Sequence, residues 1–83
     1  MAQRTAPNPE NVDKLKEAMN MAEADFRNAK VAYYNNVDYK GKRVEYEELE
    51  SYATAFIEAN RAVQKALFGK VRIKLTVARL MRE

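Results

Sequence analysis

The stretch VDKLKEAMNMAEADFRNAKVAYY, residues 12–34, carries the pattern that decides the fold. Apolar or small residues recur in it at alternating steps of three and four, which is the heptad spacing of one helix face. These residues are Val12, Leu15, Met19, Ala22, Phe26, Ala29 and Tyr33. Asn8, Pro9 and Glu10 precede the stripe and favour a helix start, because Asn caps free amide groups and Pro fits the first turn. The sequence therefore predicts a helix over residues 9–36, preceded by a disordered leader at residues 1–8.

A second stretch, LESYATAFIEANRAVQKA at residues 49–66, repeats this spacing. Its stripe consists of Leu49, Tyr52, Phe56, Ala59, Val63 and Ala66. Several glutamates lie just before it, and carboxylates stabilise the positive end of a helix dipole, so we expect a helix over residues 45–68. Both stripes place small alanines after a phenylalanine, Phe26 or Phe56, which lets two helices approach closely. The predicted fold is mainly α, with an antiparallel two-helix hairpin inside a single domain of residues 9–83.

Between the two stripes lies YYNNVDYKGKRVEY, residues 33–46, where paired Asn residues, an Asp and Gly41 favour turns. Val37 and Tyr39 alternate with polar residues before Lys40-Gly41, and Val44 and Tyr46 alternate after it. This pattern is typical of a small β-hairpin. An irregular loop that exposes its tyrosines fits the same residues, because two short strands alone are only marginally stable.

The segment GKRVEY, residues 41–46, followed by LESYATAFIEA at residues 49–59, carries a resemblance. It resembles the Gly-basic-Arg-Val-Glu-aromatic hairpin of a family of small phage head-to-tail joining proteins, whose layout is helix, hairpin, helix. The similarity covers six residues, and the second helix here begins without the Thr/Ser-rich spacer of that family. The resemblance implies a role as a small virion component.

The two stripes leave more apolar surface than one partner helix covers. Ala53, Ile57, Leu67 and Met21 lie beside the stripes and widen them. A second copy of the chain would bury this surplus in a four-helix bundle, so we expect a homodimer. Alternatively, the last fifteen residues of the chain fold back and cover it.

The last fifteen residues, GKVRIKLTVARLMRE at 69–83, fit two structures. Alternation of apolar and polar residues over 71–77 is typical of a strand, and that strand would make the protein α+β. The heptad spacing also continues through the segment, and a lone glycine costs a helix only about 1 kcal/mol, so we favour a helix, continuous or kinked near Gly69. On a continuous helix Arg61, Lys65, Arg72 and Arg79 share one side, whereas a strand groups Lys70, Arg72 and Lys74.

Either structure gives a basic surface, since no acidic residue lies between Arg61 and Arg82. Its candidate binding residues are Arg61, Lys65, Lys70, Arg72, Lys74, Arg79 and Arg82. Such a surface suits a polyanion, because each neutralised phosphate releases a counterion. Nucleic acid is therefore the first expected partner, with Tyr34, Tyr39 and Tyr46 available to stack on unpaired bases.

A protein partner is the second expectation, for example a host protein inhibited by a phage accessory protein. The chain has no cysteine and no histidine among its 83 residues, so thiolate metal sites and the usual general base are missing. The Glu45–Glu50 run is interpreted as a capping feature rather than an acid–base pair. We expect a cytoplasmic protein without enzymatic activity, cofactor, metal or membrane contact.

Overall fold

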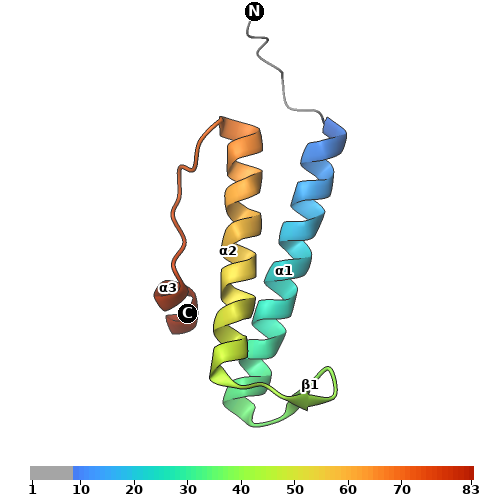
Figure 1. The fold of residues 1–83 in the computed structure, drawn as a ribbon, viewed down its shortest axis with the longest axis vertical. Helices are drawn as coiled ribbons and strands as arrows, with labels where there is room; N and C mark the ends of the chain where they lie inside the picture. The colour runs from blue at the N-terminus through green and yellow to red at the C-terminus, as the bar shows by residue number, and fades with distance from the viewer. Residues whose placement is uncertain (1–8) are drawn as a thin grey trace, which may run out of the picture.

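The computed structural model describes residues 9–83, which form two long helices, a small β-hairpin and a short third helix. Helix α1 spans Pro9–Asn35 and helix α2 spans Tyr46–Phe68. They pack antiparallel along their length, with the β-hairpin at one end (Figure 1). The predicted helical hairpin is confirmed, and each helix boundary lies within one residue of its predicted place. The predicted leader and the Asn8 cap lie outside the described residues.

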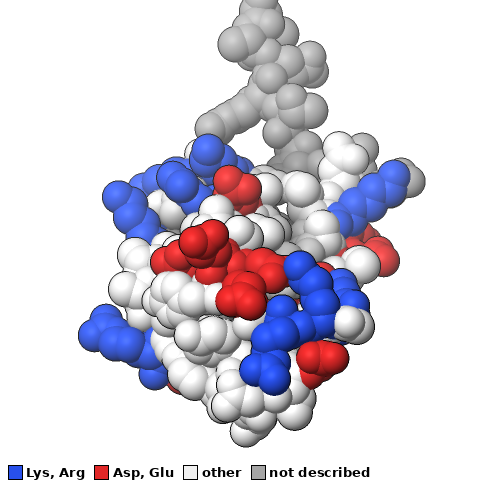
Figure 2. Space-filling model, turned by 60° about the horizontal axis from the view of Figure 1, so that its bottom comes forward, with Lys and Arg blue, Asp and Glu red and all other residues white. Residues whose placement is uncertain are grey.

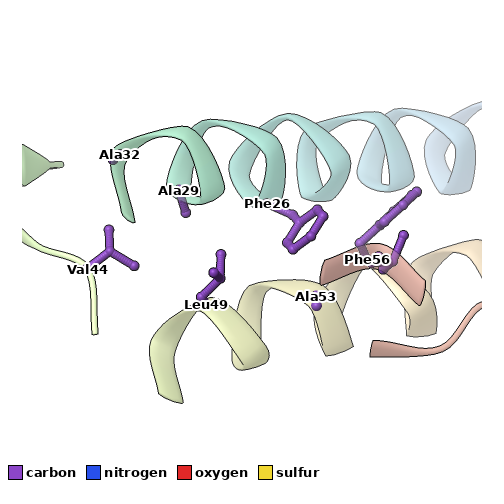
Figure 3. Packing of buried hydrophobic residues seen from close by; sticks show 8 residues of the cluster. Phe26, Ala29, Ala32, Val44, Leu49, Ala53 and Phe56 are labelled. Atoms are coloured by element: carbon purple, nitrogen blue, oxygen red, sulfur yellow. The ribbon is translucent and has the colours of Figure 1, made fainter. Parts of the chain in front are cut away.

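The core lies between α1 and α2, on the two predicted stripes. Phe26 and Leu49 are fully buried, and their neighbours Ala29 and Ala53 are small enough to let the helix backbones approach. Phe26 points from α1 toward α2, into the space beside Leu49 and Ala53 (Figure 3). The phenylalanine-and-alanine pattern therefore does what its spacing predicts, with one large ring filling the gap that the alanines leave.

The connection between the long helices is a small β-hairpin, in which two strands of two residues each are joined by a two-residue turn. Strand β1 is Asp38–Tyr39 and strand β2 is Lys42–Arg43, and the pairs Asp38↔Arg43 and Tyr39↔Lys42 are antiparallel. Lys40 and Gly41 both have positive φ, 55° and 85°, as a type I′ turn requires. The hairpin alternative is thus the correct one, and Val44 anchors it by inserting into the helical core, where it is 5% exposed.

The favoured helix over residues 69–83 is wrong for its first half. Gly69 adopts a left-handed conformation, with φ 77°, and ends α2 by donating its amide to the carbonyl of Lys65 at 2.9 Å. Residues 69–76, called the strap below, are neither helix nor strand and run back along α2 (Figure 1). Helix α3, Val77–Arg82, follows. The only sheet within residues 9–83 is β1–β2, so the α+β alternative is wrong as well.

The return of the chain has a simple physical cause. A continuous helix would carry the apolar residues after Gly69 past the first turn of α1 and away from the described core. Folding back instead buries Leu80 in the core, 2% exposed, with Leu75, Val77 and Met81 packed against the same cluster. The last residues therefore fold back onto the helical hairpin, as that alternative expected, but they leave Met21 and Leu67 of the surplus exposed.

The predicted homodimer stays a prediction. Ala53 is buried and Ile57 packs against the core within one chain, so these two residues of the apolar surplus need no second copy. Met21 and Leu67 remain exposed.

Candidate functional site

The strap is held to α2 by one side chain, Gln64, which is the buried polar residue of the described core. Its Oε1 accepts hydrogen bonds from the backbone amides of Arg72 and Ile73, at 2.8 and 2.7 Å. Its Nε2 donates to the carbonyl of Ile73 at 2.8 Å and to Oδ1 of Asn60 at 2.6 Å. The Gln64 amide thus pairs with the strap backbone as a neighbouring strand would, and it satisfies groups that an irregular segment leaves free.

Helix α3 fixes the other end of the strap. Thr76 caps it, since its Oγ1 accepts a hydrogen bond from the amide of Arg79 at 3.2 Å. Lys30 of α1 donates through Nζ to the carbonyls of Leu80, at 2.8 Å, and Glu83. A cation at the negative end of a helix is stabilising, so this contact joins α3 to α1 while Leu80 fills the core.

All seven predicted binding residues are exposed, but they do not form the predicted helical ridge. Arg61 and Lys65 lie on α2, Arg79 and Arg82 lie on α3, and Lys70, Arg72 and Lys74 lie on the strap. Because the chain reverses at Gly69, the ridge of Arg61, Lys65, Arg72 and Arg79 on one continuous helix is wrong. Three of the seven cations lie on the strap, which runs back along α2 (Figure 1), and the other four lie on α2 and α3.

None of these seven side chains makes an ion pair within residues 9–83. The cations of the salt bridges found there are Arg27, Lys40 and Lys42. Arg72 makes a different contact, with its guanidinium carbon 5.1 Å from the centre of the Phe68 ring. The positive charge of the C-terminal segment is therefore not neutralised by described carboxylates.

A hollow of about 580 Å³ lies between the end of α2 and the strap. The residues that line it are Asn60, Gln64, Phe68, Arg72, Ile73 and Leu75. Phe68 and Ile73 are large apolar residues, yet 51% and 62% of their surfaces are exposed. Sequence reasoning missed this hollow, because it exists only where the strap returns to α2, and no local pattern marks Gln64 as the residue that holds it.

At the β-hairpin end of the molecule, unlike on the strap, two lysines form ion pairs with carboxylates. Lys40 pairs with Asp25 at 3.0 Å, and Lys42 pairs with Glu48 at 2.7 Å. The Tyr39 hydroxyl donates to Asp25 at 2.5 Å. On this face acidic side chains lie between separate groups of Lys and Arg side chains (Figure 2). Lys40 and Lys42 therefore help to hold the hairpin against the two long helices, whereas Arg43 makes no ion pair within residues 9–83.

These contacts change the titration of the groups involved. The hydrogen bond from Tyr39 and the neighbouring ammonium of Lys40 lower the pKa of Asp25, and the same bond raises the pKa of Tyr39. The ammonium of Lys42 lowers the pKa of Glu48. Asp25 and Glu48 carry their charge more readily than free carboxyl groups, so both ion pairs persist in weak acid.

The tyrosines expected to be free divide into two kinds. Tyr34 and Tyr46 are exposed, whereas Tyr39 is half-buried, bonded to Asp25 and packed at 6.0 Å against the ring of Tyr52. Tyr39 is thus committed to the fold, and two of the three predicted stacking residues remain accessible.

Glu45, which precedes α2, and Glu48, in its first turn, cap the start of that helix. The amide of Glu45 donates to Oε1 of Glu48 at 3.4 Å, and the Glu48 carboxylate also holds Lys42. Across residues 9–83, no three His, Cys, Asp or Glu side chains gather where a metal ion would fit. Nor does any helix there have the length and apolar content needed to cross a bilayer.

Comparison with protein-family models, with curated proteins and with solved structures gives no match for this chain. The resemblance of GKRVEY to the phage joining proteins therefore rests on those six residues and on the order helix, hairpin, helix.

Proposed function

We propose that this protein is a non-catalytic binding protein whose basic C-terminal surface binds the phosphates of a nucleic acid. The observation that carries the proposal is the set of seven exposed cations on α2, the strap and α3 that make no ion pair within residues 9–83. Binding a phosphate there breaks no existing pair. It also releases counterions, which gives affinity without sequence preference.

The electrostatics of the rest of the chain support the same surface. Residues 61–82 contain no carboxylate, and the nearest ones along the chain are Glu58 and Glu83. At the hairpin end, by contrast, Lys40 and Lys42 are already paired with Asp25 and Glu48. A phosphate would have to displace those carboxylates, and the acidic side chains of that face would repel it (Figure 2).

The proposal is tested by fluorescence anisotropy of a labelled mixed-sequence oligonucleotide, titrated with protein at several salt concentrations between about 50 and 200 mM. If all seven cations contacted duplex phosphates, the logarithm of the affinity would fall with the logarithm of salt at a slope of about −6. Fewer contacts give a proportionally shallower slope. No binding at the lowest salt would reject nucleic acid as the partner.

The location is tested by charge reversal with a matched control. The double variant Arg72→Glu/Arg79→Glu should abolish binding at the higher salt and flatten the slope. The control Lys14→Glu/Lys16→Glu changes the net charge equally at exposed positions of α1, and we expect it to bind nearly as tightly as the native chain. Equal losses in both variants would mean that overall charge, not the C-terminal surface, determines binding.

A second candidate function, binding to a protein, is favoured by the aromatic surface at the hairpin end. Tyr34 and Tyr46 are exposed on either side of Tyr33, whose ring lies 5.2 Å and 5.8 Å from theirs. Tyr34 and Arg43 line a hollow of about 470 Å³ at this end, and exposed tyrosines beside an arginine are typical of protein interfaces. Loss of captured protein in the variant Tyr34→Ser/Tyr46→Ser, but not in Arg72→Glu/Arg79→Glu, would favour this function.

A further inference from the structure

The hollow between α2 and the strap has exposed apolar surface, and it lies on a segment rich in cations. Its rim carries Phe68 and Ile73, about half or more of whose surfaces are exposed. Lys65, Lys70 and Lys74 lie within two positions of lining residues along the chain, and none makes an ion pair within residues 9–83. Exposed apolar surface of this kind commonly marks a contact site.

The polar groups of Gln64, which line the hollow, are already hydrogen-bonded, so the hollow favours an apolar occupant over an ion. The Gln64 amide is fully engaged by Asn60 and by the strap backbone. Within residues 9–83 no buried side-chain nitrogen or oxygen lacks a hydrogen-bond partner. An occupant therefore gains little by bringing polar groups to the floor, and it gains most by covering the Phe68 ring.

Two planar groups already lie together at the rim. The Arg72 guanidinium is 5.1 Å from the centre of the Phe68 ring, and Phe68 as a whole residue remains about half exposed. Aromatic rings and guanidinium planes are the groups on which unpaired bases stack. Charge complementarity selects the same occupant, because a base arrives attached to phosphates and the cations of residues 61–82 have no acid among them.

We propose that the hollow is a base-binding subsite, so that the nucleic acid bound by this protein is single-stranded. One unpaired base lies in the hollow against Phe68, and the flanking phosphates contact lysines of the strap and of α2. The proposal rests on the proposed function and narrows it. A duplex meets only the cations, because its bases are paired and stacked inside the helix and cannot enter the hollow.

The test compares a single-stranded oligonucleotide with the duplex of the same sequence, at one salt concentration, for the native chain and for Phe68→Ala. We expect the native chain to prefer the single strand and Phe68→Ala to weaken that binding roughly 10- to 100-fold, the effect of removing one stacking side chain. Duplex affinity should stay unchanged. The salt slope should also stay unchanged, since the substitution removes no charge.

Three further variants separate stacking from other losses. Phe68→Tyr keeps an aromatic ring and should bind the single strand as the native chain does, whereas Phe68→Leu should resemble Phe68→Ala. Met21→Ala removes an exposed apolar side chain of α1 that does not line the hollow, and it should change nothing. Fluorescence of a 2-aminopurine base in the strand should be quenched by the native chain and by Phe68→Tyr only.

Failure of this inference is distinct from failure of the proposed function. Equal binding of single strand and duplex, with no effect of Phe68→Ala, overturns the subsite and leaves the phosphate-binding surface in place. No binding of either oligonucleotide overturns both. Two other occupants of the hollow would also overturn the subsite. One is a second copy of the chain, shown by light scattering as a dimer that Phe68→Ala dissociates. The other is a Glu- and Leu-rich peptide that binds through Phe68 when the single strand does not.

Discussion

The β-hairpin and the strap are both short segments that depart from the helices and carry several cations, yet the fold holds them in opposite ways. In the hairpin, Lys40 and Lys42 pair with carboxylates of the two long helices. In the strap, the Gln64 amide holds the backbone and leaves the side chains of Arg72 and Lys74 to solvent. Cations that stabilise a fold and cations that are available to a partner therefore look alike in composition, and only their surroundings separate them.

The largest expected effect is a loss of stability when Leu80, the apolar side chain that holds α3 in the core, is truncated. Leu80→Ala should lower the free energy of unfolding by about 2–5 kcal/mol, because it empties a site that is 2% exposed in the core. Leu67→Ala, at a site that is 40% exposed, is the matched control and should cost much less. Urea denaturation of both variants gives the comparison. Equal costs would show that α3 does not share the core with the long helices.

The next effect concerns the polar anchor. Gln64→Ala removes the acceptor of two strap amides and the donor to one carbonyl, and a loss of about 1–3 kcal/mol is expected for such groups. Hydrogen exchange should accelerate at the amides of Arg72 and Ile73 while the β-hairpin amides keep their native rates. Thr54→Ala, an exposed substitution on the same helix, is the control. Faster exchange in the hairpin as well would mean that the two segments unfold as one unit.

A smaller effect is expected where the strap becomes helix. Thr76→Ala removes the side-chain cap of α3 and should cost about 1 kcal/mol, whereas Thr76→Ser keeps the hydroxyl and should cost little. Fraying of α3 should be visible as faster exchange of the Arg79 amide. Thr76→Ala that leaves this amide as protected as in the native chain would show that burial of Leu80 alone defines α3.

The comparison also explains how far the sequence could predict this structure. The long helices follow from heptad spacing, because each stripe meets a stripe of the same period across the helical hairpin. The β-hairpin follows from Lys40-Gly41, a local turn signal. The path of the strap depends on Gln64, which bonds residues eight and nine positions later, and on Leu80, which packs in the same cluster as Phe26 of α1. The spacing of apolar residues within 69–83 indicates that one face of the segment is buried, but it does not indicate which part of the chain covers that face.

The candidate site divides in the same way. Its seven cations could be identified from the sequence, because a run without acidic residues is visible there. Their arrangement could not, because it changes with the single backbone reversal at Gly69. The hollow beside Phe68 was not predictable for the same reason, since two of its walls, Arg72 and Ile73, reach α2 only through that reversal.

The smallest expected effect uses pH to separate the two segments. The pKa values of Asp25 and Glu48 are lowered from ordinary values of 3.8 and 4.5, so the unfolded chain binds more protons than the folded one between the lowered and ordinary values. Both pairs thus contribute fully above about pH 4.5 and are lost as the pH falls through the lowered pKa values. NMR shifts of Tyr39 should follow this loss, while strap amides, which depend on no ion pair, should not.

In alkaline solution the lysines of the two ion pairs titrate, and there the stabilisation by these pairs decreases as the pH rises. The pKa values of Lys40 and Lys42 are raised above 10.5 by their carboxylate partners, so their contribution is complete below pH 10.5 and is lost as the pH rises through the raised values. The variant Asp25→Asn/Glu48→Gln should remove the acid response of the hairpin, and Asp38→Asn, which alters a strand carboxyl group outside the described ion pairs, should retain it. Because both pairs are exposed and screened by salt, the response should be small and should shrink further at high ionic strength. A strap that responds to acid as strongly as the hairpin does would mean that its cations, too, have carboxylate partners, and they would then no longer be free for phosphate.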